Sequence, residues 1–192
     1  MTDFPELFVL RHGQTEWNAI GRHQGRLDSS LTDLGRQQAA RQGQILKTLE
    51  LGAIDAWCSP QGRAMATAQI ALEPAGLTAR TDARLCEVHF GDWQGLCADE
   101  ISARWPDLAP EHHAPFDWHF LSPGGETFDD LRVRATGFLQ DLTGPTVIVT
   151  HGVLSKVLRG VWLGLDRTAT QAISGGQGVV FHLKDGRQTC LE

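Results

Sequence analysis

The stretch Leu7-Phe8-Val9-Leu10-Arg11-His12-Gly13 decides the fold, because four apolar residues run directly into an arginine and a His-Gly pair. A similar design returns at Val147-Ile148-Val149-Thr150-His151-Gly152. Short runs of apolar and β-branched residues are typical of strands buried on both faces, and the glycine permits a tight exit. A third strand is predicted at 54–58. It runs into Ser59-Pro60, where the serine can cap a helix and the proline can occupy its first turn.

Helical periods fill the intervals between these strands. Thr32 is the predicted N-cap of a helix from Asp33 to Glu50. Small residues recur every four positions in it and permit close approach to a neighbour, namely Gly35, Ala39 and Gly43. Because Gly35 holds the third helical position, a capping box is excluded. Apolar residues at helical spacing predict three further helices, at 64–72, at 126–143 and directly after His151-Gly152.

The order of these elements predicts an α/β protein, a three-layer α/β/α sandwich with a mostly parallel central sheet. Apolar runs on either side of Asp185-Gly186 add an edge hairpin of 178–182 with 188–191. We expect residues 1–192 to form a single domain with a lid-like excursion at about 105–125, which holds four prolines and no Lys or Arg. Ligands of such sheets bind beyond the carboxyl ends of the strands. His12 and His151 are therefore expected on one rim, beside the helix start after Ser59-Pro60.

Charge and cysteine content argue against several classes of protein. Seventeen Lys and Arg against 23 Asp and Glu give a net charge of −6, so we expect no binding to nucleic acid or anionic membranes. No apolar run approaches the ~18 residues that a membrane span needs, and the chain start has no export pattern, which predicts a cytoplasmic protein. The spacing of the cysteines fits neither a zinc site nor a disulfide scaffold, so we expect reduced thiols at Cys58, Cys86, Cys97 and Cys190.

Cations gather at the predicted rim in spite of the acidic composition. Arg11 adjoins His12, Arg63 lies at the start of a helix that follows a strand, and His151 ends another parallel strand. Two imidazoles and two guanidiniums beside helix N-termini form a positive pocket, which is what a tetrahedral dianion requires.

Seven motifs, in this order along residues 7–163, resemble the signature of the histidine phosphatase superfamily, in its phosphoglycerate-mutase-like branch. They are Arg11-His12-Gly13-Gln14-Thr15-Glu16-Trp17-Asn18, Gly21-Arg22-His23-Gln24-Gly25, Leu31-Thr32-Asp33-Leu34-Gly35, Ser59-Pro60-Gln61-Gly62-Arg63-Ala64, Leu85-Cys86-Glu87-Val88-His89-Phe90-Gly91-Asp92-Trp93-Gln94-Gly95, Pro123-Gly124-Gly125-Glu126-Thr127 and Thr150-His151-Gly152. The resemblance implies a phosphoglycerate mutase-like fold.

The resemblance also implies a role for each site residue. His12 is the implied nucleophile, and Glu87 the carboxylate that protonates the leaving oxygen and then accepts a proton from water. The implied holders of the phosphoryl oxygens are Arg11, Arg63 and a protonated His151. Further phosphate or substrate contacts are expected from Asn18, Gln24, Thr15 and Gly152. No metal or cofactor is expected, because fixed cations already meet the phosphoryl charge. They should also depress the pKa of His12. The sequence does not decide which of its two ring nitrogens attacks.

Departures from the mutase pattern favour hydrolysis over phosphoryl transfer. Phe90 stands where cofactor-dependent mutases usually have tyrosine, and 105–126 supplies no cation for a substrate carboxylate. We therefore predict a metal-independent phosphate monoester hydrolase that acts on a small-molecule phosphate ester. Two alternatives stay open: phosphoglycerate mutase-type transfer, and a non-catalytic phosphate-sensing or scaffold protein. A homodimer also stays open. A nucleotide-binding module is weaker, since the Gly-rich 174–178 lacks phosphate-loop spacing and indicates a turn.

The excursion leaves the leaving group undecided. Its aromatic residues suit an apolar or aromatic alcohol, or else they fasten the loop to the core; they are Trp105, Phe116, Trp118 and Phe120. Its histidines fit a metal site or simple exposure; they are His112, His113 and His119. From the lack of cations in the excursion we expect monophosphates to be preferred over bisphosphates.

Overall fold

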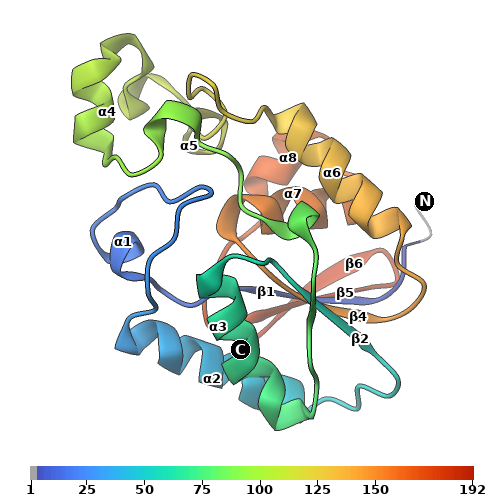
Figure 1. The fold of residues 1–192 in the computed structure, drawn as a ribbon. Helices are drawn as coiled ribbons and strands as arrows, with labels where there is room; N and C mark the ends of the chain where they lie inside the picture. Colours follow the sequence, from blue (N-terminus) through green and yellow to red (C-terminus); the bar gives the residue numbers. More distant parts are fainter. Residues whose placement is uncertain (1–3) are drawn as a thin grey trace.

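A six-stranded sheet forms the centre of the molecule in the computed structural model, which describes residues 4–192 (Figure 1). The strand order is β3-β2-β4-β1-β5-β6. The strands are β1 (Leu7–Arg11), β2 (Asp55–Cys58), β3 (Arg80–Thr81), β4 (Thr146–Thr150), β5 (Val180–Lys184) and β6 (Arg187–Leu191). The first four run parallel, whereas β5 pairs antiparallel with β1 and β6 pairs antiparallel with β5. The predicted mostly parallel sheet and the edge hairpin are both confirmed.

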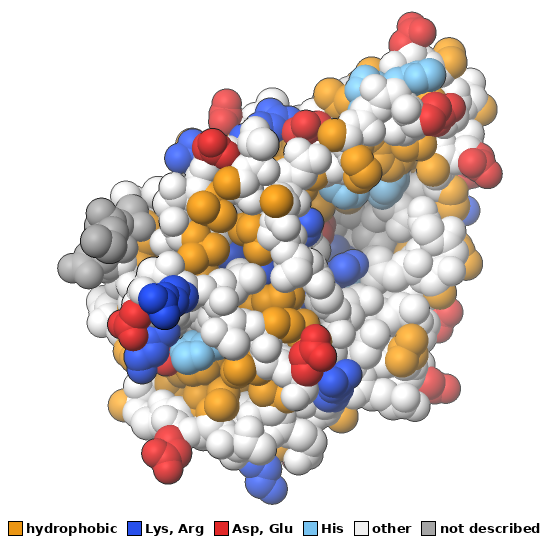
Figure 2. Space-filling model, turned by 180° about the vertical axis from the view of Figure 1, so that it is seen from behind, with side chains coloured by type: hydrophobic (Ala, Val, Ile, Leu, Met, Phe, Trp, Pro, Cys, Tyr) orange, Lys and Arg blue, Asp and Glu red, His pale blue; other side chains and the backbone are white. Residues whose placement is uncertain are grey.

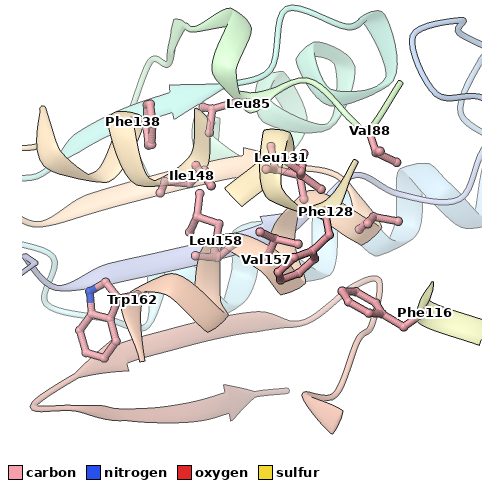
Figure 3. Packing of buried hydrophobic residues seen from close by; sticks show 14 of the residues in the cluster. Leu85, Val88, Phe116, Phe128, Leu131, Phe138, Ile148, Val157, Leu158 and Trp162 are labelled. Carbon is pink, nitrogen blue, oxygen red and sulfur yellow. The ribbon is translucent and has the colours of Figure 1, made fainter. Parts of the chain in front are cut away.

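Helices cover both faces of this sheet and make the three predicted layers (Figure 1). On one face α2 (Asp33–Lys47) and α3 (Gly62–Leu72) bury Phe8 and Leu10 of β1. On the other face α6 (Phe128–Gln140) and α7 (Gly152–Trp162) bury Leu7 and Val9. Figure 3 shows this second layer, with Leu131 and Leu158 close to Ile148 of β4. Successive β1 residues thus point into opposite layers, because side chains alternate across a strand.

Capping side chains fix where two of the four predicted helices begin. Thr32 accepts from the Gly35 N–H at 3.0 Å and starts α2, without a capping box, as predicted. α2 ends at Lys47, three residues before the predicted end. The predicted helix at 126–143 is shorter, because Thr127 and Asp130 form a capping box that starts it at Phe128.

The predicted cap of α3 is wrong. The helix begins at Gly62 with Gln61 as N-cap, so Ser59 and Pro60 lie outside it. The Ser59 hydroxyl instead lies 2.8 Å from Nε2 of His151. The Ser59 hydroxyl, which the local pattern predicts as a helix cap, therefore contacts a residue that is distant in sequence.

Short elements make up most of the remaining chain. They are α1 (Glu16–Ala19), η1 (Glu73–Ala75), η2 (Ala83–Leu85), η3 (Gly91–Trp93), α4 (Ala98–Arg104), η4 (Pro106–Leu108), η5 (Pro110–His112), α5 (Pro115–Trp118) and α8 (Arg167–Ala172). Figure 1 shows α4 and α5 at one end of the molecule, on the side of the carboxyl end of β1. Within residues 4–192 no helix combines the length and apolar character needed to cross a bilayer.

Candidate active site

The two His-Gly exits meet at the carboxyl ends of β1 and β4. Arg11 pairs with Thr150 across the parallel ladder, and the His12 N–H donates to the Thr150 carbonyl at 2.9 Å. The imidazole centroids of His12 and His151 lie 5.1 Å apart. The predicted rim is therefore present, and the topology of the sheet produces it.

His12 has its two ring nitrogens in different environments. Nδ1 lies 2.7 Å from the Gly13 carbonyl oxygen, which can only accept, so Nδ1 carries the proton. Nε2 therefore keeps its lone pair, and the Nε–H of Arg63 points to it at 3.3 Å. Burial first, and then Arg11 and Arg63, hold the His12 pKa well below its usual value. The expected depression of this pKa is confirmed, with burial as its larger cause.

Arg63 is held in place by the loop that follows Gln24. Its Nη1 donates to Asp28 at 2.8 Å and to the Leu27 carbonyl at 2.7 Å, while Nη2 donates to the Gly25 carbonyl at 3.0 Å. The side chain is 2% exposed. A planar guanidinium fixed on three sides presents its remaining N–H groups in one orientation.

Arg11 lies against the first residue of α7. A Cβ at Gly152 would stand 3.2 Å from the guanidinium carbon of Arg11, so the glycine makes room for it. The Arg11 Nε is buried and has no hydrogen-bond partner among residues 4–192. Burial lowers the pKa of Arg11, with Glu87 acting to raise it and Arg63 acting to lower it. Gly152 thus brings a cation and a helix N-terminus together.

His151 is fully buried, and one of its ring nitrogens is unpartnered. Nε2 lies 2.8 Å from the Ser59 hydroxyl, whereas Nδ1 has no partner within the described chain. Burial, followed by Arg63 and His12, holds the His151 pKa well below its usual value. The expected protonation of His151 therefore requires a negative charge close to the imidazole.

Glu87 is fixed by the start of α7. Its two carboxylate oxygens accept from the backbone N–H groups of Val88 at 2.9 Å and of Val153 and Leu154 at 3.1 Å. The first turn of a helix leaves such donors free, and its dipole favours an acidic group there. Glu87 lines the same cavity as His12, so the carboxylate and the imidazole face one space.

The other expected contact residues divide into two groups. Asn18, Gln24 and Gly152 line the cavity. Gln24 is nevertheless committed to the protein, because its amide donates to Thr15 at 2.8 Å and accepts from Ser29 at 3.0 Å. Thr15 is fully buried as the N-cap of α1 and is not among the residues that line the cavity. It braces Gln24 and the Asn18 backbone, so its expected direct phosphate contact is not supported.

Arg11, His12, Arg63 and Gly152 line one part of a cavity of about 300 Å³, which is named the phosphate pole after the contact that the resemblance implies. Figure 2 shows the hollow, with Lys or Arg side chains inside it and histidine at its upper rim. Other residues that line the cavity are His23, Phe90, Phe116, His119, Lys156 and Arg159, of which Lys156 and Arg159 form its far pole. The cavity thus has cations at both poles.

The excursion at 105–125 is fastened by its aromatic residues. Phe116 and Trp118 are buried in the hydrophobic core, with Trp105 and Phe120 packed against it, and Phe116 alone of the four lines the cavity. The fastening role therefore explains most of the aromatic content. Among the residues that the structure describes, no group of three or more His, Cys, Asp or Glu could hold a metal ion.

Several side chains complete the site although the sequence analysis assigned them no such role, namely His23, Asp28, Ser59, His119, Lys156, Arg159 and Gln177. A usable signal existed for two of them. Lys156 and Arg159 stand four and seven positions after Gly152, and helical periodicity puts such positions on one face.

The chain is similar to several known proteins. The family model of the histidine phosphatase superfamily (branch 1) matches residues 7–191. A glucosyl-3-phosphoglycerate phosphatase of Mycobacterium tuberculosis is 35% identical over 182 residues, which cover 88% of this chain and 80% of that protein. Phosphoglycerate mutase-like protein 4 of Arabidopsis thaliana is 39% identical over 166 residues, covering 81% and 70%. A mycobacterial glucosyl-3-phosphoglycerate phosphatase solved with VO3 superposes with a TM-score of 0.82 at 32% identity, covering 97% of this chain and 98% of the other.

Proposed function

Because the chain belongs to the histidine phosphatase superfamily, branch 1, and is a phosphoric monoester hydrolase, we propose that it works through a phosphohistidine at Nε2 of His12. The observation that carries this proposal is the bond from Nδ1 of His12 to the Gly13 carbonyl. It leaves Nε2 unprotonated beside two fixed guanidiniums, with a lone pair that accepts from the Nε–H of Arg63. A neutral nucleophile approaches a phosphate dianion without charge repulsion.

In the first half-reaction Nε2 of His12 attacks phosphorus and a P–N bond forms. The P–O bond to the alcohol breaks, and the departing oxygen takes its electron pair and a proton from Glu87. The proton stays on Nδ1, which donates to the Gly13 carbonyl oxygen, and this oxygen faces the positive charge that develops on the ring. Splitting hydrolysis into two displacements lowers each barrier.

The fixed cations and α7 meet the charge on the phosphoryl oxygens. Arg11 has an unpartnered Nε–H, Arg63 is locked by Asp28, and Gly152 begins a helix whose N-terminus favours anions. A dianion in this space raises the pKa of His151, so the imidazole gains a proton when substrate binds. The buried Nδ1 of His151 then donates to a phosphoryl oxygen.

In the second half-reaction water replaces the departed alcohol. Glu87, now a carboxylate, takes a proton from that water, whose oxygen attacks phosphorus as the P–N bond breaks. Inorganic phosphate leaves, and the electron pair returns to Nε2 of His12. Each catalytic group is then in its starting state.

Hydrolysis rather than mutase transfer is supported by the wall of the cavity at Phe90. This side chain is buried against His23 and His119 and carries no hydroxyl. Position 90 therefore offers no hydrogen bond to a phosphorylated product held for a second transfer. The sequence contains no tyrosine, so no tyrosyl hydroxyl from another position takes this role.

The test compares the wild-type protein with His12→Ala on a panel of phosphate esters in the presence of EDTA, with release of inorganic phosphate as readout. The wild type is expected to turn over with EDTA present, and the alanine variant to lose turnover. Turnover by His12→Ala overturns the nucleophile, and loss of wild-type activity with EDTA overturns the metal-independent mechanism. Phosphate that passes to a second alcohol instead of water favours the mutase alternative.

We also propose the cytoplasm as the compartment of this protein. Cys58 and Cys86 are buried free thiols, which fit a reducing environment. Fractionation of source cells, with an antibody to the chain, tests this: recovery in an exported fraction contradicts it.

A further inference from the structure

The far pole of the cavity is built by α7, the helix that also begins the phosphate pole. Gly152, Lys156 and Arg159 follow one another at helical spacing and all line the cavity. A rise of about 1.5 Å per residue puts Lys156 about 6 Å and Arg159 about 10 Å along the helix from Gly152. α7 therefore sets a fixed separation between the phosphoryl site and two further cations.

Neither of these cations has an acidic partner. Within residues 4–192 no carboxylate lies within ion-pair distance of Lys156 or Arg159. The ammonium of Lys156 donates only to the Gln171 carbonyl, at 3.3 Å. Arg159 donates to neutral oxygens of Ser155, Ser174 and Gln188 and stacks on Phe181, 3.8 Å from the ring centroid.

Burial makes these unpaired charges costly. Arg159 is fully buried, and Lys156 is partly buried beside it. Burial and the neighbouring Arg159 lower the pKa of Lys156, and burial lowers that of Arg159 to about 10. Burial makes the ionised form of a side chain unfavourable when no counter-charge is close to it. An anion that enters the cavity supplies this counter-charge and is therefore bound strongly.

The walls around Lys156 leave its ammonium open to the cavity. Gly175 faces it without a side chain, and a Cβ there would stand 3.6 Å from Cε of Lys156. On another side the ammonium lies 5.8 Å from the ring centroid of Phe116. Burial first, and then the charges of Arg11 and Lys156, lower the pKa of His119, which thus lies within electrostatic reach of both poles.

We propose that Lys156, backed by Arg159, is an anion subsite for the leaving group, and that the substrate is a phosphate monoester of an alcohol that carries a carboxylate. This inference rests on the proposed hydrolase. Only the ammonium of Lys156 is open to the cavity, because the guanidinium of Arg159 already donates to protein oxygens. One available cation balances the single negative charge of a carboxylate better than the two negative charges of a second phosphate. Of the two interpretations that the aromatic excursion left open, an apolar alcohol fits this subsite poorly, because α7 supplies the cations that the excursion lacks.

The experiment uses pairs of esters that differ at the carboxylate. One pair is 3-phosphoglycerate and glycerol 1-phosphate, and the other is O-phosphoserine and O-phosphoethanolamine. The wild type is expected to show about tenfold or higher kcat/KM for the carboxylate member of each pair, as a charge-assisted hydrogen bond supplies. Lys156→Gln should bring both ratios close to one, mainly through KM, and Lys156→Arg should restore them. Lys184→Gln, at an exposed lysine paired with Glu6, should leave the ratios and the activity as they are.

Each result bears on a separate claim. Equal ratios in the wild type and Lys156→Gln, with good turnover of all esters, overturn the subsite while the hydrolase stands. A marked preference for bisphosphates such as 2,3-bisphosphoglycerate also overturns it, because the far pole then holds a second phosphate. Failure of the wild type to hydrolyse any ester, p-nitrophenyl phosphate included, overturns the proposed function and the subsite with it.

Discussion

The Nε of Arg63 lies 3.3 Å from Nε2 of His12, so the arginine that is proposed to hold the phosphoryl group also orients the nitrogen that is proposed to attack it. Asp28 controls this relationship from outside the cavity. Its carboxylate accepts from Nη1 of Arg63 at 2.8 Å and from the Arg63 backbone N–H. The nucleophile therefore depends on a loop residue that does not touch it.

Asp28→Asn is expected to lower kcat/KM about tenfold, since a hydrogen bond to a charged group is weakened and the guanidinium gains freedom. Arg63→Lys should cost more, because an ammonium cannot reproduce the fork. Steady-state kinetics with p-nitrophenyl phosphate provide the measurement. Asp55→Asn removes an ion pair to Arg80 that is exposed and serves as the control. Equal activities of the two Asn variants contradict the assigned role of Asp28.

Glu87→Gln tests the general acid through the leaving group. A loss of about 10²-fold or more in kcat/KM is expected for glycerol 1-phosphate, whose alcohol must be protonated as it departs. The loss should be smaller for p-nitrophenyl phosphate, because p-nitrophenolate leaves without a proton. Glu50→Gln, at an exposed position, is the matched control. Thermal unfolding verifies that Glu87→Gln is folded, and equal losses for both esters argue against an acid at this position.

Acid should destabilise the protein through His23 and His119. Burial is the main cause that lowers the pKa of each from 6.5 to about 4. Between these values the unfolded chain binds more protons than the folded one, so stability falls as pH drops from 6.5 towards 4 and is fully retained above 6.5. Each histidine contributes a slope of at most about 1.4 kcal/mol per pH unit.

Urea unfolding at several pH values measures this dependence in the wild type and in His23→Gln/His119→Gln. The double variant should show a flatter loss of unfolding free energy towards pH 4, since its amides do not titrate. The two histidines have no such role if both proteins show the same slope.

Gly35 is expected to tolerate no side chain. A Cβ there would stand 2.0 Å from the Gln14 carbonyl oxygen, and one at Gly13 would stand 2.1 Å from the Gly35 oxygen. Gly35→Ala should therefore cost roughly 3 kcal/mol of unfolding free energy, because backbone rather than a mobile side chain must move. Gly137 lies within α6, and a Cβ there would have Nη1 of Arg84 as its nearest neighbour, at 4.0 Å. Gly137→Ala should therefore raise the free energy of unfolding by about 1 kcal/mol. Similar effects of the two substitutions on chemical denaturation contradict the close crossing.

Periodicity and capping residues predicted the strands and helices that are determined by interactions between residues close in sequence. The strands before His12 and His151, the Thr32 cap and the small residues of α2 all follow from periodicity and capping. β3 was not predicted, because it has two residues and both are exposed. Ser59 gave a local signal that a contact with His151, 92 positions away, overrides.

The site was predictable where strands end and unpredictable where loops supply support. Asp28 reaches Arg63 across 35 positions, and Gln177 donates to the His12 carbonyl across 165 positions. Neither lies in a periodic segment, so no pattern in the chain marks it. The depressed pKa of His151 also escaped prediction, because its main cause is burial, which only the folded chain reveals.

Trapping the phosphorylated protein tests the central claim most directly. The wild type is mixed with a radiolabelled phosphate ester, quenched in alkali and digested, and the labelled peptide is identified. We predict one acid-labile phosphoryl group on Nε2 of His12, formed before inorganic phosphate appears and absent from His12→Ala. Label on another residue, or release of phosphate at full rate without any labelled protein, contradicts the account.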